Sequence, residues 1–210
     1  MVKVALSALG GVADAARNLA AEIPGWDFDS VAAAADAKWS KMLSCVAVEG
    51  SDDQKRNFYT SLYHLFIQPN DLSDVGQPPH YSTLSTWDTF RAAHPLYTIL
   101  VPEIVPDLVR SMQRQGEFTG YLPIWTLWGR DNQCMIGTHS VPVIVDAYLK
   151  GFRGFDVEEA FEAVTNSLTV SHKAVNNGAW GLVKEDWEAY DRLGYVPYDG
   201  MCESSGGRRV

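Results

Sequence analysis

Two short segments concentrate side chains that could bind a polar small molecule. The first reads Trp-Asp-Thr-Phe-Arg from Trp87 to Arg91, and the second, from Trp125 to Gln133, combines two tryptophans with four charged or amide side chains. Aromatic faces cover the apolar C–H face of a sugar, while carboxylates and amides hold its hydroxyls. A buried loop cannot easily satisfy so many polar groups, so the second segment is expected to line a cleft or the solvent. Alone, the two segments predict only a polar small-molecule site.

Asp88 also has a purely structural interpretation. Aspartate is a common helix cap, and Arg91 stands three residues further on as a partner for its carboxylate. In that interpretation Trp87 is ordinary core material. The local pattern alone favours the structural interpretation, because caps are common.

Helices are the elements expected to position these segments. Asp29 is predicted to cap a helix over 30–45, and Ser51 to Gln54 form a capping-box pattern that opens a second helix ending at Pro69. Apolar periodicity and glycine or proline stops predict further helices over 86–100 with a bend at Pro95, 102–116 ending at Gly116, 137–150, a stretch beginning at Asp156, and 184–193. The residues expected to face inward are Val141, Ile144, Val145 and Tyr148 in the helix over 137–150, and Phe161, Val164 and Leu168 in the helix that begins at Asp156.

The predicted fold class is all-α. A strand over 2–6 leading into a turn is the one strand expected, and no linker divides the chain. Helices of this length joined by loops suit stacked helical hairpins, either a bundle or an α/α toroid. The lack of an internal repeat argues against a regular solenoid.

Composition excludes several classes of protein. A net charge of −9 argues against a nucleic-acid partner, and no apolar stretch is long enough to predict a membrane span. The widely spaced Cys45, Cys134 and Cys202 predict neither a zinc site nor a disulfide framework. The apolar run near the N-terminus is short and broken by Gly10 and Gly11, so no signal peptide is evident.

Many segments, in order, resemble signatures of glycoside hydrolase family 92. They lie at residues 22–29, 58–64, 68–70, 81–96, 120–125, 134–140, 146–151 and 194–197, and include Glu-Ile-Pro-Gly-Trp-Asp-Phe-Asp, Gln-Pro-Asn, Trp-Asp-Thr-Phe-Arg and Gly-Tyr-Leu-Pro-Ile-Trp. One such motif would be weak evidence. This number in register makes the resemblance specific from about residue 20 to 199.

The resemblance implies a calcium-dependent exo-α-mannosidase that inverts the anomeric centre and acts on mannose-containing glycans. Family members join a β-sandwich to an (α/α)6 toroid; residues 1–16 resemble the end of the sandwich, and 17–210 the first part of the toroid. It also implies that Trp87 and Asp88 contact the mannose, with Asp88 binding its hydroxyls, and that Trp128 and Asp131 line the same pocket. In many relatives Asn-Glu-Thr stands where this chain has Arg130-Asp131-Asn132, and this shorter carboxylate weakens the inference for Asp131.

The resemblance further implies an incomplete catalytic set. The general acid, the base and the main calcium ligands of the family come from the second half of the toroid, so no catalytic or metal-ligating residue is assigned here. We therefore expect no mannosidase turnover by the chain alone, and self-association through an exposed apolar face. The parent enzyme would be secreted or periplasmic.

Two alternatives from other classes remain open. The chain could be a helical scaffold or carbohydrate-binding module that uses the tryptophan segment without chemistry. It could also belong to another α/α-toroid enzyme, either a different glycosidase or a polysaccharide lyase. Family 92 fits the order of the motifs better than either.

Overall fold

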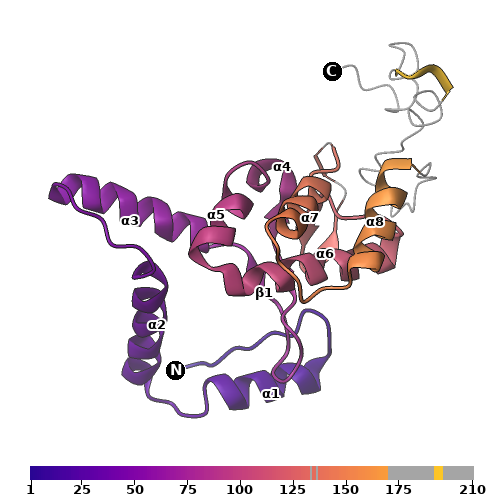
Figure 1. Cartoon of the computed structure of the whole chain (residues 1–210). Helices are drawn as coiled ribbons and strands as arrows, with labels where there is room; N and C mark the ends of the chain where they lie inside the picture. The colour runs from indigo at the N-terminus through magenta and orange to yellow at the C-terminus, as the bar shows by residue number, and fades with distance from the viewer. Residues whose placement is uncertain (133, 136, 170–191, 196–210) are drawn as a thin grey trace, which may run out of the picture.

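The computed structural model describes residues 1–132, 134–135, 137–169 and 192–195, and it is mostly helical (Figure 1). Three helices come first, α1 (Val12–Glu22), α2 (Phe28–Leu43) and α3 (Asp52–Phe66). A helical body follows, made of α4 (Thr86–Thr89), α5 (Ala93–Leu100), the 3-10 turn η1 (Pro102–Ile104), α6 (Val105–Thr119), α7 (Ser140–Leu149) and α8 (Val157–Thr169). Five short strands lie between the helices: β1 (Asn70–Asp71), β2 (Tyr81–Ser82), β3 (Leu84–Ser85), β4 (Trp125–Leu127) and β5 (Arg130–Asp131). No described helix is long and apolar enough to span a membrane.

Helix α6 is the centre of the body. It packs against α7, α8, η1 and β2, and its inward residues Leu108 and Val109 are 2% and 0% exposed. The helix was expected to end at Gly116 but continues to Thr119, because Gly120 with φ 79° supplies the left-handed residue that ends it. Gly116 instead lies buried within the helix.

Helix α3 extends away from the body and contacts α2, which runs in a different direction (Figure 1). The capping box of α3 is confirmed: Ser51 Oγ accepts from Gln54 N at 3.3 Å, and Gln54 Oε1 accepts from Ser51 N at 2.9 Å. The cap of α2 is Asp27 rather than the expected Asp29, so that helix begins two residues earlier than expected. None of the residues of α2 is buried.

The expected N-terminal strand is wrong. Residues 2–6 pair with no strand among the described residues, and a strand without a partner leaves its backbone groups unsatisfied. The prediction that no strand follows them is also wrong, because β1 pairs with β2, and β3, β4 and β5 form a small antiparallel sheet. These strands are two or three residues long, too short for a period-2 pattern to reveal. Helix α1, which was not predicted, begins at Val12 and continues past residue 16.

The body helices differ from their predicted forms in two places. The predicted helix over 86–100 is interrupted after Thr89 rather than bent at Pro95, and Pro95 lies in the first turn of α5, where a missing N–H costs nothing. In α7 the buried apolar residues are Val143, Ile144 and Ala147, whereas two residues expected inside, Val145 and Tyr148, are exposed.

Helix α8 begins as predicted, with Asp156 Oδ1 accepting from Glu159 N at 3.0 Å. Of its three residues expected inside, Val164 packs against the core, but Phe161 and Leu168 are exposed. Most of the helix predicted over 184–193 lies outside the described residues.

Candidate functional site

The small sheet brings the two chemistry-bearing segments side by side. Strand β3 pairs with β4 so that Ser85 lies opposite Trp125, and β4 pairs with β5 so that Thr126 lies opposite Asp131. Thr86, directly after β3, donates to the Ile124 carbonyl from its amide at 3.1 Å and from its hydroxyl at 2.7 Å. The backbone that carries Trp87 and Asp88 is therefore bonded to the start of the tryptophan segment. We call the paired strands β3, β4 and β5, together with Thr86, the frame of the site.

Asp88 lies exposed in the single turn of α4. The N-cap of this turn is Ser85, which makes no side-chain capping bond, and no hydrogen bond or ion pair joins Asp88 to any described residue. Arg91, the partner that the structural interpretation expected, instead lies over the ring of Phe90 at 5.0 Å. The described residues therefore show neither a helix cap made by Asp88 nor an ion pair between Asp88 and Arg91, and the Asp88 carboxylate faces solvent.

Trp87 is positioned by the side chain of His139. The ring of His139 meets Trp87 edge to face at 5.0 Å and contacts Phe90 at 4.4 Å. Gly137, with φ 86°, leaves room for this ring, since any Cβ there would collide with the imidazole. His139 precedes α7, and Ser140 Oγ at the start of that helix donates to the Pro123 carbonyl. The helix therefore positions His139, and His139 positions Trp87, which stays 41% exposed.

Asp131 has a backbone-supporting role that its sequence position did not reveal. Its Oδ1 accepts from the amides of Ile124 at 3.3 Å and Trp125 at 3.0 Å. An ionised carboxylate holds backbone amides about twice as strongly as a neutral acceptor does. Asp131 therefore fixes the start of β4, next to the frame of Asp88.

Trp128 points to a different place. It stands with Gly129 at the tip of the β4–β5 hairpin, and their φ values of 52° and 78° are those of a two-residue type I′ turn. Its indole is 64% exposed and lines a groove with the N-terminal segment 4–8 and α1. The structure thus brings Trp87, Asp88 and Asp131 onto one frame and directs Trp128 into a separate groove.

Two buried polar side chains, Gln115 and His80, support the tip of the β4–β5 hairpin. Gln115 Nε2 donates to the Gly129 carbonyl at 2.5 Å and lies 3.2 Å from His80 Nε2, so we assign Nε2 of His80 as the acceptor. Burial, with a further contribution from the charge of Arg114, lowers the pKa of His80 below its usual 6.5. A neutral His80 suits this arrangement, because it can accept the amide hydrogen.

A cluster of metal-ligating side chains is not found in the described residues. Among them, no group of three or more histidine, cysteine, aspartate or glutamate side chains is arranged to hold a metal ion.

Comparison with known proteins gives a consistent result. The model of the glycosyl hydrolase family 92 catalytic domain matches residues 14–209. A family GH92 inverting mannosidase from Bacteroides thetaiotaomicron is 31% identical with a TM-score of 0.79, and the alignment covers 90% of this chain and 27% of that one. A second GH92 alpha-mannosidase from the same organism is 29% identical, also with a TM-score of 0.79, over 90% of this chain and 26% of that one. This second enzyme has also been solved in complex with mannoimidazole. No curated protein matches the sequence. The chain spans about a quarter of the length of these solved structures.

Proposed function

Because the chain belongs to glycosyl hydrolase family 92, we propose that it supplies one side of the mannose-binding site of an inverting exo-α-mannosidase. We call this side, which consists of Trp87, Asp88 and the residues that position them, the mannose-binding wall. The observation that carries the proposal is the state of Asp88, an exposed carboxylate without an ion-pair partner in the described part of the chain, next to an indole fixed by His139. Such a group is ready to accept hydrogen bonds from the hydroxyls of a neutral sugar.

The division of labour among the wall residues follows from their contacts. Asp88 accepts from the sugar hydroxyls, and the exposed part of Trp87 covers an apolar C–H face. Asp131 does not touch the sugar in this proposal but holds the backbone of Ile124 and Trp125, to which Thr86 is bonded. His139 acts through Trp87 and is therefore a positioning residue.

Catalysis needs groups that we do not assign to the described residues. Inversion requires two carboxyl groups about 6.5–9.5 Å apart, one to protonate the leaving oxygen and one to activate water. We propose that these carboxyls, and the oxygen ligands of the calcium ion of the complete enzyme, come from the remainder of an (α/α)6 toroid joined to a β-sandwich. The calcium ion would hold adjacent mannose hydroxyls, and the complete enzyme would act outside the cytoplasm, secreted or in the periplasm.

The proposal is tested on the 210-residue chain by two assays. Titration with methyl α-mannoside should show saturable but weak binding, with a Kd of about 1 mM or weaker, because one wall supplies few contacts. The Asp88→Asn variant should weaken it about tenfold, the cost of losing hydrogen bonds to a charged acceptor. Asp52→Asn, an exposed carboxylate at the start of α3, is the matched control and should bind like the parent chain. Equal binding by Asp88→Asn contradicts the proposal.

The second assay measures hydrolysis of an aryl α-mannoside. We expect no turnover above the buffer rate, because no acid and base pair is assigned to this chain. Hydrolysis that persists through purification and is absent from a preparation of an unrelated protein would overturn the assignment of the catalytic carboxyls to other residues.

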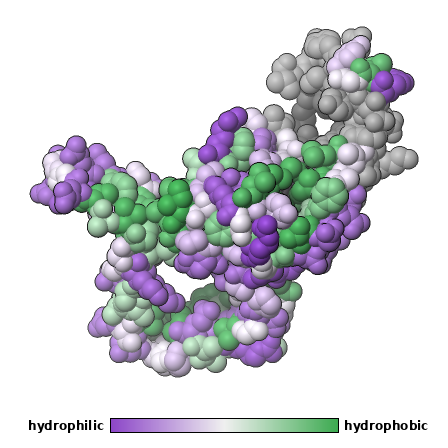
Figure 2. Space-filling model, viewed as in Figure 1, coloured by the Kyte–Doolittle hydropathy of each residue, from purple (hydrophilic) through white to green (hydrophobic). Residues whose placement is uncertain are grey.

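Self-association is the expected behaviour of the isolated chain. Hydrophobic residues gather over α7 and α8 (Figure 2), and a groove of about 360 Å³ runs between these helices, lined by residues such as Val145, Tyr148 and Phe161. Exposed apolar patches of this kind mark association surfaces. Sedimentation velocity should show oligomers that Phe161→Glu reduces, and a monodisperse monomer of the parent chain at high concentration would refute this expectation.

A further inference from the structure

One groove in the described part of the chain lies apart from Asp88, which is not among its lining residues. It has a volume of about 620 Å³, within the range of small-molecule sites, and is lined by the N-terminal segment 4–8, α1, residues 71–73 and Trp128. Its polar side chains include Glu22 and Asp71, and none of its lining residues is basic. The groove therefore combines an exposed indole with carboxylates.

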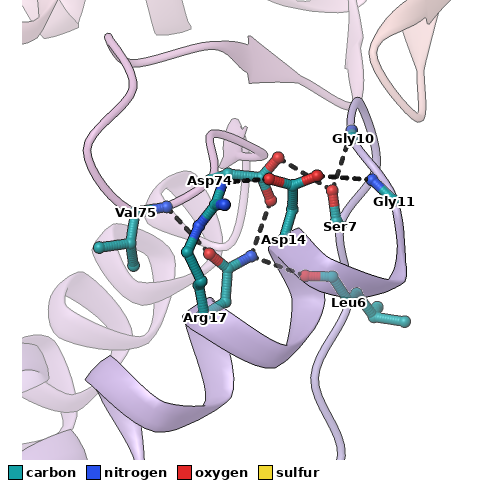
Figure 3. Close-up of polar contacts among 9 residues, drawn as sticks. Leu6, Ser7, Gly10, Gly11, Asp14, Arg17, Asp74 and Val75 are labelled. Carbon is teal, nitrogen blue, oxygen red and sulfur yellow. Dashed lines mark hydrogen bonds and ion pairs between the residues drawn. The ribbon is translucent and has the colours of Figure 1, made fainter.

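The N-terminal wall of the groove is fixed by a network of hydrogen bonds (Figure 3). Asn18, only 7% exposed, donates to the Leu6 carbonyl at 2.9 Å and to Asp74 at 2.7 Å, and its own carbonyl accepts from the Val75 amide at 2.9 Å. Ser7 Oγ donates to the second oxygen of Asp74 at 2.9 Å. One buried carboxylate and one buried amide thus tie three separate segments together.

The other end of this wall is fixed by Lys3. Its ammonium donates to the Ile23 carbonyl at 2.7 Å and lies 4.5 Å from the ring centroid of Trp26. The backbone between Lys3 and Ser7 is therefore held at both ends across the groove.

Trp128 is presented to the groove by a strained turn. A φ of 52° is rare for a bulky residue and is tolerated where neighbours hold it. Here Ser82 Oγ accepts from the Gly129 amide at 2.9 Å and Gln115 holds the Gly129 carbonyl, so the hairpin tip is clamped from below. Despite this clamp, the indole remains 64% exposed. Such strain in a fixed turn fits a residue selected for presentation rather than for packing.

Two carboxylates that line the groove retain hydrogen-bonding capacity. Glu22, in the last turn of α1, makes no hydrogen bond or ion pair with the described residues. Asp71 uses Oδ1 for Ser73 and for the His80 amide, while its second oxygen has no bond of this kind within the described ranges. Two carboxylates with spare acceptor capacity disfavour an anionic ligand, and together with the exposed indole they suit a neutral ligand rich in hydroxyls.

From this geometry we infer that the groove is a second carbohydrate subsite, with Trp128 as its stacking platform and Glu22 as a hydroxyl acceptor. Its ligand class is a neutral oligosaccharide, and the volume exceeds what one sugar ring needs. The choice of a glycan over other neutral polyols rests on the proposed function, whereas the existence of the site rests on the groove itself. The subsite holds a chain of sugars without acting on it.

The test uses the indole N–H resonance of Trp128 in the ¹⁵N-labelled 210-residue chain, assigned by its loss in Trp128→Phe. Titration with α-linked mannobiose should shift this resonance saturably. Trp128→Ala should weaken the binding measured at neighbouring amides about tenfold or more, Trp128→Phe should retain most of it, and Glu22→Gln should weaken it about threefold. Phe28→Ala, at a similarly exposed aromatic residue of α2 outside this groove, is the matched control and should leave the binding unchanged.

The outcomes separate this inference from the proposed function. If Asp88→Asn removes the shifts at residues 86–90 but leaves the Trp128 titration intact, both sites exist and are distinct. If Trp128→Ala binds as tightly as the parent chain, or the indole resonance does not move while residues 86–90 respond, the second subsite is refuted and the proposed function stands. A shift at Trp128 with none at residues 86–90 supports the subsite and contradicts the mannose-binding wall.

Discussion

Lowering the pH should destabilise this fold through one histidine. His94 on α5 is 4% exposed, its ring stands edge to face with Tyr97 at 5.6 Å, and its Nε2 is buried with no hydrogen-bond partner within the described ranges. Burial lowers the pKa of His94 from 6.5 to about 4. Between these two values the unfolded chain binds a proton that the folded chain does not, so the free energy of unfolding falls as the pH falls.

The size of this effect follows from the two pKa values. Each unit of pKa difference corresponds to about 1.4 kcal/mol, so the loss should approach about 2 kcal/mol at pH 5 and about 3 kcal/mol near pH 4. The contribution of His94 to the free energy of unfolding is fully present above pH 6.5 and is lost as the pH falls to 4. His80, whose pKa is also lowered, adds to the loss in the same direction.

Urea unfolding followed by circular dichroism at pH 7.5, 6 and 5 measures the slope of the free energy of unfolding against pH. The His94→Leu variant should lose much of it and should exceed the parent chain in stability at pH 5, because it removes both the titrating ring and a buried nitrogen without a partner. His64→Gln, at an exposed histidine in the last turn of α3, is the control and should keep the parent slope. An unchanged slope in His94→Leu would refute the reasoning.

Three further substitutions test the packing, the capping and the frame of the site. Leu108→Ala in the core of α6 should cost about 2–5 kcal/mol in urea unfolding, whereas Leu149→Ala, 76% exposed, should stay within about 0.5 kcal/mol; similar losses would contradict the assignment of the core. Ser51→Ala should cost about 1 kcal/mol and speed amide hydrogen exchange in the first turn of α3, and unchanged exchange would mean that the capping box contributes nothing. Asp131→Ala should cost roughly 1.5–3 kcal/mol and shift the amide resonances of residues 124 and 125, and a variant without both effects would show that its carboxylate does not support β4.

The helices were predictable where the signal is local. The capping box at Ser51 and the Asp156 cap depend on residues three positions apart, and both are present. The pairing of β3 with β4 was less accessible, because the two strands lie some forty residues apart in the sequence. Strands of two or three residues are also too short to show a periodic pattern.

The sequence pointed to the two segments of the candidate site but not to how they are assembled. Trp87 and Asp88 follow β3, which pairs with the strand that precedes Asp131. Nothing local could show that the Asp131 carboxylate is used by two backbone amides, or that His139 meets Trp87 across more than fifty residues. The direction of Trp128 depends on a positive φ, and a Trp-Gly pair gives a much weaker turn signal than Asn-Gly does.

The measurement that tests the mannose-binding wall most directly is a map of amide shifts in the ¹⁵N-labelled chain on addition of methyl α-mannoside. We predict that the largest saturable shifts fall on residues 86–90 and on the amides of residues 124–126, which share the frame of Asp88, and that Asp88→Asn removes them while the rest of the spectrum stays folded. Saturable shifts confined to other parts of the chain, or an undiminished response in Asp88→Asn, would contradict the account.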